Sequence, residues 1–110
     1  MEPGEEIVAS LESAMRLAGL QQGAVTSLIG ALDVGKINTM DGSGRDVPQT
    51  FIGPYDLSGN GEIIDGAAHL HVVLSGYHSR MDERVRAGHL VAGVVAQQFF
   101  VRAYILPTAP

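Results

Sequence analysis

Apolar residues near the N-terminus recur at helical spacing, which predicts an amphipathic helix from about Glu5 to Ala18. Glu5 and Glu6 fall in its first turn and Arg16 near its end, where their charges complement the helix dipole. Gly19 follows as the residue expected to take a left-handed conformation and end the helix. The apolar stripe should face the core, and its members are Ile7, Val8, Leu11, Ala14, Met15 and Ala18.

From Gly23 the pattern becomes β-branched and is interrupted by glycines. Residues 24–39 predict a long central strand that is bent or bulged at Gly30 or Gly35. The Gly, Ser, Asp and Pro content of residues 41–48 predicts a loop, and Pro48 should make the next strand start late.

The middle of the chain predicts short strands separated by turns. Phe51 to Tyr55 suggests a strand broken by Gly53-Pro54, and residues 59–61, Gly-Asn-Gly, are a turn signal. Residues 62–64 then form a short strand, and Asp65-Gly66 is a pair favoured in two-residue hairpins.

The last third alternates between apolar strands and one polar turn. Ala67 to Leu74 reads as a strand, residues 75–80 as a turn, and residues 89–106 as one or two strands interrupted near Gln97. A helix over residues 90–98 fits the same letters. One helix against an antiparallel or mixed sheet gives an α+β fold, an α/β-type sandwich.

Composition supports one packed domain that spans residues 1–110. Hydrophobic residues make up 45% of the chain and charged residues 17%, which favours a globule over a disordered segment. The sparse charge and the 14 glycines suggest thin β structure whose outer faces are covered by identical subunits.

The charge balance and the N-terminus exclude several classes of protein. The net charge is −5, and Asp82 and Glu83 interrupt the arginines at 80, 84 and 86, so direct DNA binding is disfavoured. The acidic N-terminus lacks a signal-peptide pattern, and no apolar run approaches the ~20 residues of a bilayer span. We therefore expect a soluble, cytoplasmic protein without a membrane partner.

A pair of histidines carries the strongest chemical signal. His69 and His71 lie two apart in a predicted strand, so both imidazoles leave the same face about 7 Å apart. His89 begins the next apolar segment, and an antiparallel return could bring it beside them. Three imidazoles suit Zn²⁺ or, less specifically, Ni²⁺, Co²⁺ or Fe²⁺. The alternative is that the histidines are only half-buried polar residues of a strand.

Other residues near the histidines are candidates for chemistry of a weaker kind. Cysteine is absent, so only His, Asp or Glu could hold a transition metal. Arg80, Arg84 and Arg86 could clamp a carboxylate or phosphate, although a salt-bridged surface hairpin explains them better. Residues 56–63 imitate the start of a calcium-binding EF-hand loop, but Ala67 occupies the position of its bidentate glutamate.

The chain resembles the "plants and prokaryotes conserved" domain family, known as PPC or PCC, of the bacterial type without an AT-hook. The resemblance rests on Pro3-Gly4-Glu5-Glu6, residues 27–32, Leu57-Ser58-Gly59-Asn60, His69-Leu70-His71-Val72 and residues 87–93. The last two segments, read in this order, are the most specific, and the matching stretches cover nearly the whole chain.

The resemblance implies an α/β or α+β sandwich that assembles as a homotrimer, with His69, His71 and His89 at a metal site near a subunit interface. In plants the domain accompanies a DNA-binding AT-hook, and no such segment occurs here. Three departures are evident. Only Met1 and Glu2 stand where a first strand is usual, Ala87 replaces a glycine, and the region around residues 51–57 is shortened. The missing strand could leave an edge open or covered by another subunit.

Three functions follow as hypotheses. The first is a homotrimeric metal-binding module with a regulatory or interaction role. The second is a small metalloenzyme acting on a small molecule, with Glu62, Asp65, Tyr77 or His78 as acid/base candidates. The third is a structural trimer whose histidines only hold the interface.

Overall fold

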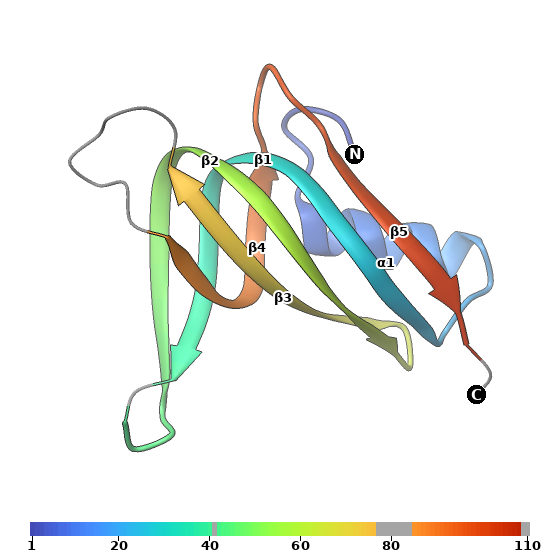
Figure 1. Ribbon diagram of the computed structural model, residues 1–110. Coiled ribbons are helices and arrows are strands. Elements are labelled where there is room, and N and C mark those ends of the chain that lie inside the picture. The colour runs from blue at the N-terminus through green and yellow to red at the C-terminus, as the bar shows by residue number, and fades with distance from the viewer. Residues whose placement is uncertain (41, 77–84, 109–110) are drawn as a thin grey trace.

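The computed structural model describes residues 1–40, 42–76 and 85–108 and shows one helix and five strands (Figure 1). The elements are, in chain order, α1 Ile7–Leu17, β1 Gly23–Met40, β2 Asp46–Ile64, β3 Ala67–Gly76, β4 Arg86–Val95 and β5 Val101–Pro107. All strand pairs are antiparallel, in the order β2-β3-β4-β1-β5.

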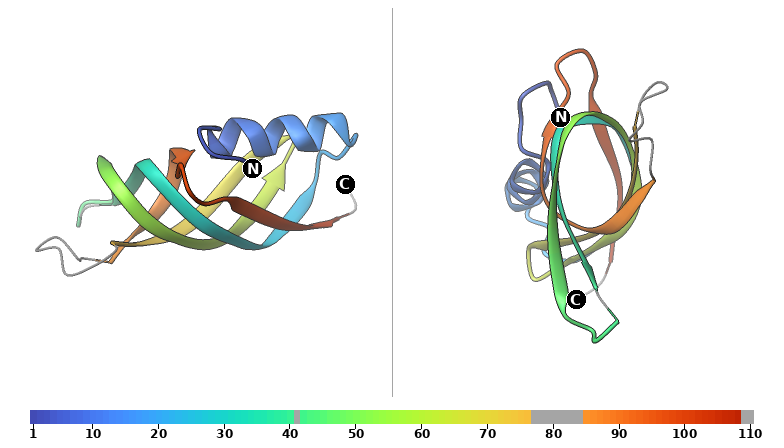
Figure 2. Two further views of the ribbon diagram at one scale, coloured as in Figure 1. Left: turned by 90° about the horizontal axis from the view of Figure 1, so that it is seen from above. Right: turned by 90° about the vertical axis from the view of Figure 1, so that its left-hand side faces the viewer.

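A further pairing of β1 with β2 closes β1, β2, β3 and β4 into a ring. Figure 2 shows this ring end-on in its right-hand view. β1 is long enough to pair with β2 along its length, with β4 over one half and with β5 over the other. Register shifts between Val25 and Leu28 and between Leu32 and Val34 mark the irregular points of this curved strand. The second shift lies between the two glycines, 30 and 35, at which a bend was predicted.

The predicted helix is confirmed with slightly shorter bounds. The placement of Glu5 and Glu6 in the first turn was wrong, because the helix begins at Ile7 and no acidic residue lies in that turn. Glu6 is instead the N-cap, and its carboxylate accepts hydrogen bonds from the backbone N–H groups of Val8 and Ala9. Gly19 has φ +71°, as expected for a helix stop. Neither the helix nor its end at Gly19 required knowledge of long-range contacts to predict.

The predicted division of residues 46–64 into short strands and turns was wrong. Residues 59–61 do not turn, because they pair with Val72, His71 and Leu70 within one continuous strand β2. A Cβ atom added at Gly59 or Gly61 would overlap a backbone oxygen of β3. These glycines are therefore required by close strand approach, which the same letters do not distinguish from a turn. The EF-hand-like letters lie in this strand as well.

The β2 strand also begins at Asp46, although Pro48 was expected to delay the start of the strand. The Asp65-Gly66 hairpin is confirmed, since both residues have positive φ, 50° and 81°. Residues 90–95 belong to a strand and not to the alternative helix. The fold class is therefore more β-rich than the expected sandwich of helix and sheet, with a single short helix lying along the sheet.

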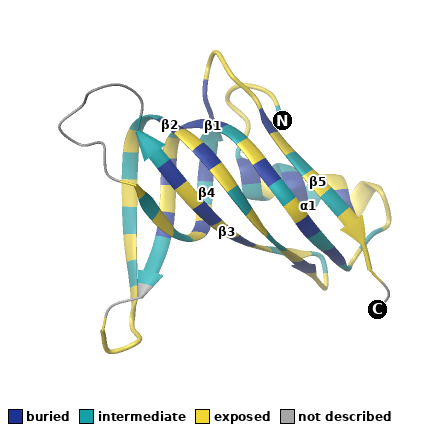
Figure 3. Ribbon diagram, viewed as in Figure 1, coloured by how far each residue is buried: buried dark blue, intermediate teal, exposed yellow. Residues whose placement is uncertain are grey.

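One hydrophobic core joins the helix to the strands. Alternate positions along β3 are buried and exposed, as Figure 3 shows by colour. The helix contributes Ile7, Leu11 and Met15 to the same cluster as Leu32 and Leu70. Two polar contacts hold it in place, because Glu6 accepts a hydrogen bond from the N–H of Gly93 and Glu12 accepts one from the N–H of Ala68. Among the described residues no helix is long and apolar enough to span a bilayer.

Candidate metal site

His69 and His71 project from the outer face of β3. They occupy exposed positions that alternate with the buried residues Leu70 and Val72, so the period of two predicted from the sequence holds. The strand therefore places both imidazoles on one solvent-facing side, as expected of a pair that could bind an ion.

His89 lies beside His71 on the neighbouring strand. The two residues are direct partners in the β3–β4 register, and their ring centroids are 4.3 Å apart with the rings perpendicular. Both are exposed, so a cation could reach their nitrogens from solvent. The antiparallel return that the sequence suggested thus brings one of the two β3 histidines into contact with His89.

The register also reveals neighbours that sequence reasoning missed. Asn60 of β2 pairs with His71, and Asn38 of β1 pairs with His89, so a row of two imidazoles flanked by two asparagines crosses four strands. Asn60 had been assigned to a turn, and Asn38 had no signal at all. Only the pairing of strands could have identified them.

The four acid/base candidates separate in the structure. Glu62 is the direct β2 partner of His69 and is exposed on the same strand pair. Asp65 is part of the β2–β3 hairpin, where its carboxylate accepts a hydrogen bond of 2.8 Å from Nε2 of Gln22. Tyr77 and His78 lie outside the described residues. Glu62 is thus the described candidate that pairs with a histidine.

The described residues include no group of three or more His, Asp or Glu side chains arranged to hold a metal ion. His71 and His89 are close enough for two ligands of one ion, and imidazole nitrogen is a good donor for Zn²⁺. His69 lies two residues further along the same face. The donor chemistry fits a transition metal, but within the part of the chain that the structure describes only two candidate donors come together.

An open hollow of about 430 Å³ adjoins His71 on the outer face. Its lining includes the hydroxyl-bearing Ser58, the carboxamide of Asn60, and the small or apolar residues Val73 and Ala87. A molecule held there would lie next to the imidazole of His71. The site therefore has space for a ligand beside the histidine pair.

The arginine cluster is only partly described. Arg86 places its guanidinium 5.1 Å from the centroid of the Phe51 ring, a cation–π distance. Arg80 and Arg84 lie outside the described residues. The stacking accounts for one of the three arginines by packing.

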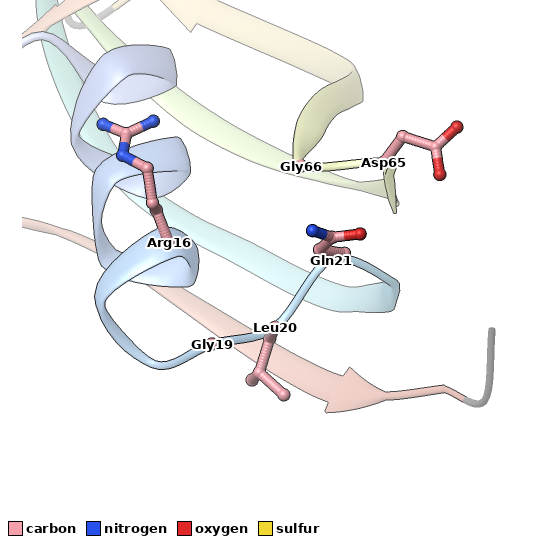
Figure 4. A pocket seen from close by; sticks show the side chains of 6 residues that line it. All are labelled: Arg16, Gly19, Leu20, Gln21, Asp65 and Gly66. Atoms are coloured by element: carbon pink, nitrogen blue, oxygen red, sulfur yellow. The ribbon is translucent and has the colours of Figure 1, made fainter.

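A second hollow, of about 300 Å³, lies at the C-terminal end of α1 (Figure 4). Its lining consists of Arg16, Gly19, Leu20, Gln21, Asp65 and Gly66. None of these residues is a histidine, so this hollow is separate from the candidate metal site.

These features define a small antiparallel β domain, closed by strand pairing, with one helix and an exposed histidine pair. The model of the Plants and Prokaryotes Conserved (PCC) domain matches residues 1–107, and the chain belongs to that family. The resemblance seen in the sequence is thereby confirmed. A comparison with curated proteins found no match.

Solved structures share this fold. A metal-containing protein from Archaeoglobus fulgidus is 26% identical, with a TM-score of 0.75 over 97% of this chain and 74% of that one. A plant- and prokaryote-conserved protein from Pyrococcus horikoshii is 22% identical, with a TM-score of 0.74 over 98% and 76%. A candidate DNA-binding protein from Ralstonia eutropha is 18% identical, with a TM-score of 0.71 over 94% and 74%.

Proposed function

We propose that this domain is a metal-binding module in which His69, His71 and His89 hold a divalent transition metal, with Zn²⁺ as the first candidate. The observation that carries the proposal is the contact between the His71 and His89 rings on an exposed face. Three neutral imidazoles leave a further position of a zinc ion open to water or another ligand. The metal-containing relative from Archaeoglobus fulgidus supports the same class of ligand.

The proposal includes a homotrimer in which neighbouring copies complete or cover the site. Several large apolar side chains are exposed on the described chain, among them Val73 and Val91 on the two histidine-bearing strands. An exposed apolar surface around a pair of metal ligands is expected where a protein meets another subunit. Sedimentation equilibrium should give three times the mass of the 11.6 kDa chain, and a monomer at micromolar concentration would contradict the assembly.

Metal analysis with matched variants tests the site. The protein, stripped with chelator and reloaded with Zn²⁺, should retain metal through gel filtration. We expect His71→Ala and His89→Ala to weaken Zn²⁺ binding more than ~10-fold. Loss of a residue that only hydrogen-bonds to a metal ligand typically lowers metal affinity by about tenfold or more, and loss of a ligand itself should cost at least as much. His69→Ala should show a similar loss, because His69 is the proposed third ligand.

The fourth histidine of the chain provides the control. His78→Ala should bind Zn²⁺ like the wild type, because His78 is not among the proposed ligands. If the wild type binds no metal, the module and the enzyme hypotheses both fail and the structural trimer remains. Equal losses in all four variants would instead point to nonspecific binding by surface imidazoles.

The biological role proposed for the module is regulation or interaction through partners. One relative is named a candidate DNA-binding protein, but a net charge of −5 opposes the phosphate backbone. We therefore propose that any association with nucleic acid is indirect. Gel-shift assays at low salt should show no complex with duplex DNA, and a salt-sensitive complex would overturn this part of the proposal.

A metalloenzyme is the second candidate, and two observations favour it. Glu62 lies opposite His69, and the hollow beside His71 offers room for a small molecule next to the metal. In this reading the metal would polarise a carbonyl or activate water, and Glu62 would accept or donate the proton. Glu62→Gln should leave Zn²⁺ binding unchanged while abolishing turnover of any substrate found by screening hydrolysable esters and amides. Turnover that survives the substitution would remove Glu62 from this role.

A further inference from the structure

A hollow of about 240 Å³ lies beside the connection between β4 and β5. We call it the Asp33 pocket, and it is lined by Asp33, Pro54, Ala96, Gln97, Gln98 and Phe99. None of these residues lines the hollow beside His71. Most of the connection is coloured as exposed in Figure 3, so solvent reaches the pocket. The Asp33 pocket is therefore separate from the candidate metal site and accessible to a ligand.

An irregularity in β1 places Asp33 in the wall of this pocket. The residues on either side of it pair with adjacent residues of β4, Val95 and Val94, so Asp33 is an extra residue in that ladder. Gly35 and Ile37 are buried, and strict alternation would turn Asp33 inward with them. A β-bulge re-aims a side chain in this way and is common next to functional sites. The bulge thus accounts for a carboxylate at the pocket instead of in the core.

Backbone hydrogen bonds hold the connection in place. The Ala96 N–H donates to the Ala31 carbonyl at 3.1 Å, and the Ala31 N–H donates to the Phe100 carbonyl at 3.2 Å. The Phe99 N–H donates to the Ala96 carbonyl at 3.2 Å, so a tight turn lies within the connection. The walls of the pocket are therefore formed before a ligand arrives, which lowers the ordering cost of binding.

The carboxylate of Asp33 is the charged group of the pocket. Its Oδ2 accepts a hydrogen bond of 3.2 Å from the Gln97 N–H, whereas a carboxylate has room for about four such bonds. Among the residues that the structure describes, no lysine or arginine forms an ion pair with it. The net charge of −5 adds a long-range attraction for cations. The pocket therefore has the electrostatics of a cation site.

The other walls favour a flat organic cation. Phe99 contributes an aromatic ring, and the carboxamides of Gln97 and Gln98 supply further hydrogen-bond acceptors. A guanidinium group stacks on aromatic rings and donates bidentate hydrogen bonds to carboxylates. The volume is below the ~300–1,000 Å³ of pockets for drug-sized ligands, so it suits one side chain. An arginine side chain matches both the size and the chemistry of the pocket.

An exposed apolar pair lies beside the pocket. Val34 and Ile52 are direct partners in the β1–β2 register and are 37% and 78% exposed. Val34 follows Asp33 in the sequence, and Ile52 lies two residues before Pro54. A free small cation would leave these side chains in water, whereas a polypeptide that carries the arginine would cover them. The surroundings of the pocket therefore favour a polypeptide ligand.

We propose that the Asp33 pocket binds an arginine side chain of a partner polypeptide. The guanidinium donates hydrogen bonds to the Asp33 carboxylate and stacks on Phe99. Apolar residues next to the arginine contact Val34 and Ile52. This site goes beyond the proposed metal module and uses none of its histidines.

A synthetic peptide tests the proposal on the intact protein. The probe is the acetylated and amidated peptide Gly-Leu-Arg-Leu-Gly, followed by ¹⁵N chemical shifts. Saturable shift changes are expected at the amides of Asp33, Gln97 and Phe99. A peptide with citrulline in place of arginine keeps the shape without the charge and should bind at least ~10-fold more weakly. No shift change at these amides at millimolar peptide, or equal binding of the two peptides, would overturn the proposal.

Matched variants of the protein test the two walls. Asp33→Asn keeps an acceptor for Gln97 but removes the charge, and should weaken binding at least ~10-fold. Asp46→Asn makes the same charge change at an exposed position outside the lining and should weaken binding by less than about twofold. Phe99→Leu should weaken binding about threefold through loss of stacking. Phe100→Leu is its control, because Phe100 is outside the lining and the two rings are exposed alike, at 43% and 45%.

Equal affinities within either pair of variants would contradict the proposal. The same spectra show whether each variant is folded, so a lost interaction is distinguished from a lost structure.

Two other occupants are tested in the same way. Ile52→Ser should weaken binding of the peptide and leave binding of ethylguanidinium unchanged. Ethylguanidinium that binds as tightly as the peptide would overturn the polypeptide as ligand. Shift changes at the pocket that rise with protein concentration alone would identify a second copy of the chain and overturn a foreign partner. None of these measurements requires metal, so their failure is distinguishable from failure of the metal proposal.

Discussion

At the scale of residues, the register between β3 and β4 determines whether two histidines can bind one metal ion. His71 and His89 are 18 positions apart in the sequence, and they meet because β3 and β4 pair at these positions. A shift of one residue would turn one imidazole into the core face. The metal proposal therefore depends on single residues whose placement is set by strand pairing.

Glu6 is a second residue with more than one role. Its carboxylate caps α1 through the N–H groups of Val8 and Ala9 and also accepts a bond of 2.9 Å from Gly93 in β4. We expect Glu6→Ala to lower the free energy of unfolding by about 1–2 kcal/mol. The substitution removes the helix cap and leaves the N–H of Gly93 without its acceptor. Urea denaturation followed by circular dichroism measures the change.

Glu5→Ala is the matched control for this prediction. Glu5 is exposed and its carboxylate accepts a hydrogen bond from the N–H of Glu2, so its removal should cost less than about 0.5 kcal/mol. Equal changes in the free energy of unfolding for the two substitutions would contradict a stabilising role of the N-cap and of the contact with Gly93.

At the scale of elements, the long strand β2 depends on glycines that resemble turn residues. Gly59 and Gly61 permit β2 to run close to β3, since any side chain there would meet backbone oxygen. β2 is also the strand that pairs with β1 and closes the ring. Both the ring closure and the row of asparagines and histidines therefore depend on the close approach that Gly59 and Gly61 allow.

Substitution of Gly61 should damage this element. Gly61→Ala is expected to destabilise the protein by about 3 kcal/mol, because the new methyl group would collide with the His69 carbonyl and force β2 away. Gly42→Ala is the control, since a Cβ atom at Gly42 meets nothing within 4 Å. Thermal unfolding of both variants checks the prediction, and similar melting temperatures would contradict it.

At the scale of the whole molecule, stability rests on one core shared by the helix and the closed sheet. Leu32 of β1 is fully buried within it, whereas Leu17 at the end of α1 is 87% exposed. The free energy of unfolding of a 110-residue domain is small, so the cost of a single core cavity is a large fraction of it. The exposed apolar residues outside this core are what the proposed subunit contacts would cover.

The two leucines offer a direct comparison. Leu32→Ala should cost about 3 kcal/mol, the sum of lost apolar burial and an unfilled cavity. Leu17→Ala should change the free energy of unfolding by less than about 0.5 kcal/mol, because its side chain is already in water. Denaturant titrations of the two variants measure the difference, and a small effect at Leu32 would mean that the core collapses around the gap.

Local patterns in the sequence determined several elements without tertiary information. The helical period from Ile7 to Met15, the alternation along β3 and the Asp65-Gly66 hairpin each depend on neighbouring residues alone. The same local alternation placed His69 and His71 on one face, and His89 became a candidate because it begins the next apolar segment. The family could also be identified from short segments of the sequence, most specifically residues 69–72 and 87–93.

Only the tertiary structure decided the rest, because those features depend on pairing between distant segments. The letters of Gly59-Asn60-Gly61 suit a turn or a close strand pair equally, and only the β3 backbone beside them selects the strand. The ring closure, the contact of His71 with His89 and the placement of Asn38 and Asn60 beside them all follow from long-range register. Local propensity carries no information on which residue lies opposite which. The candidate donors and their antiparallel return were therefore readable from the sequence, but the direct pairing of His89 with His71 and not with His69 was not.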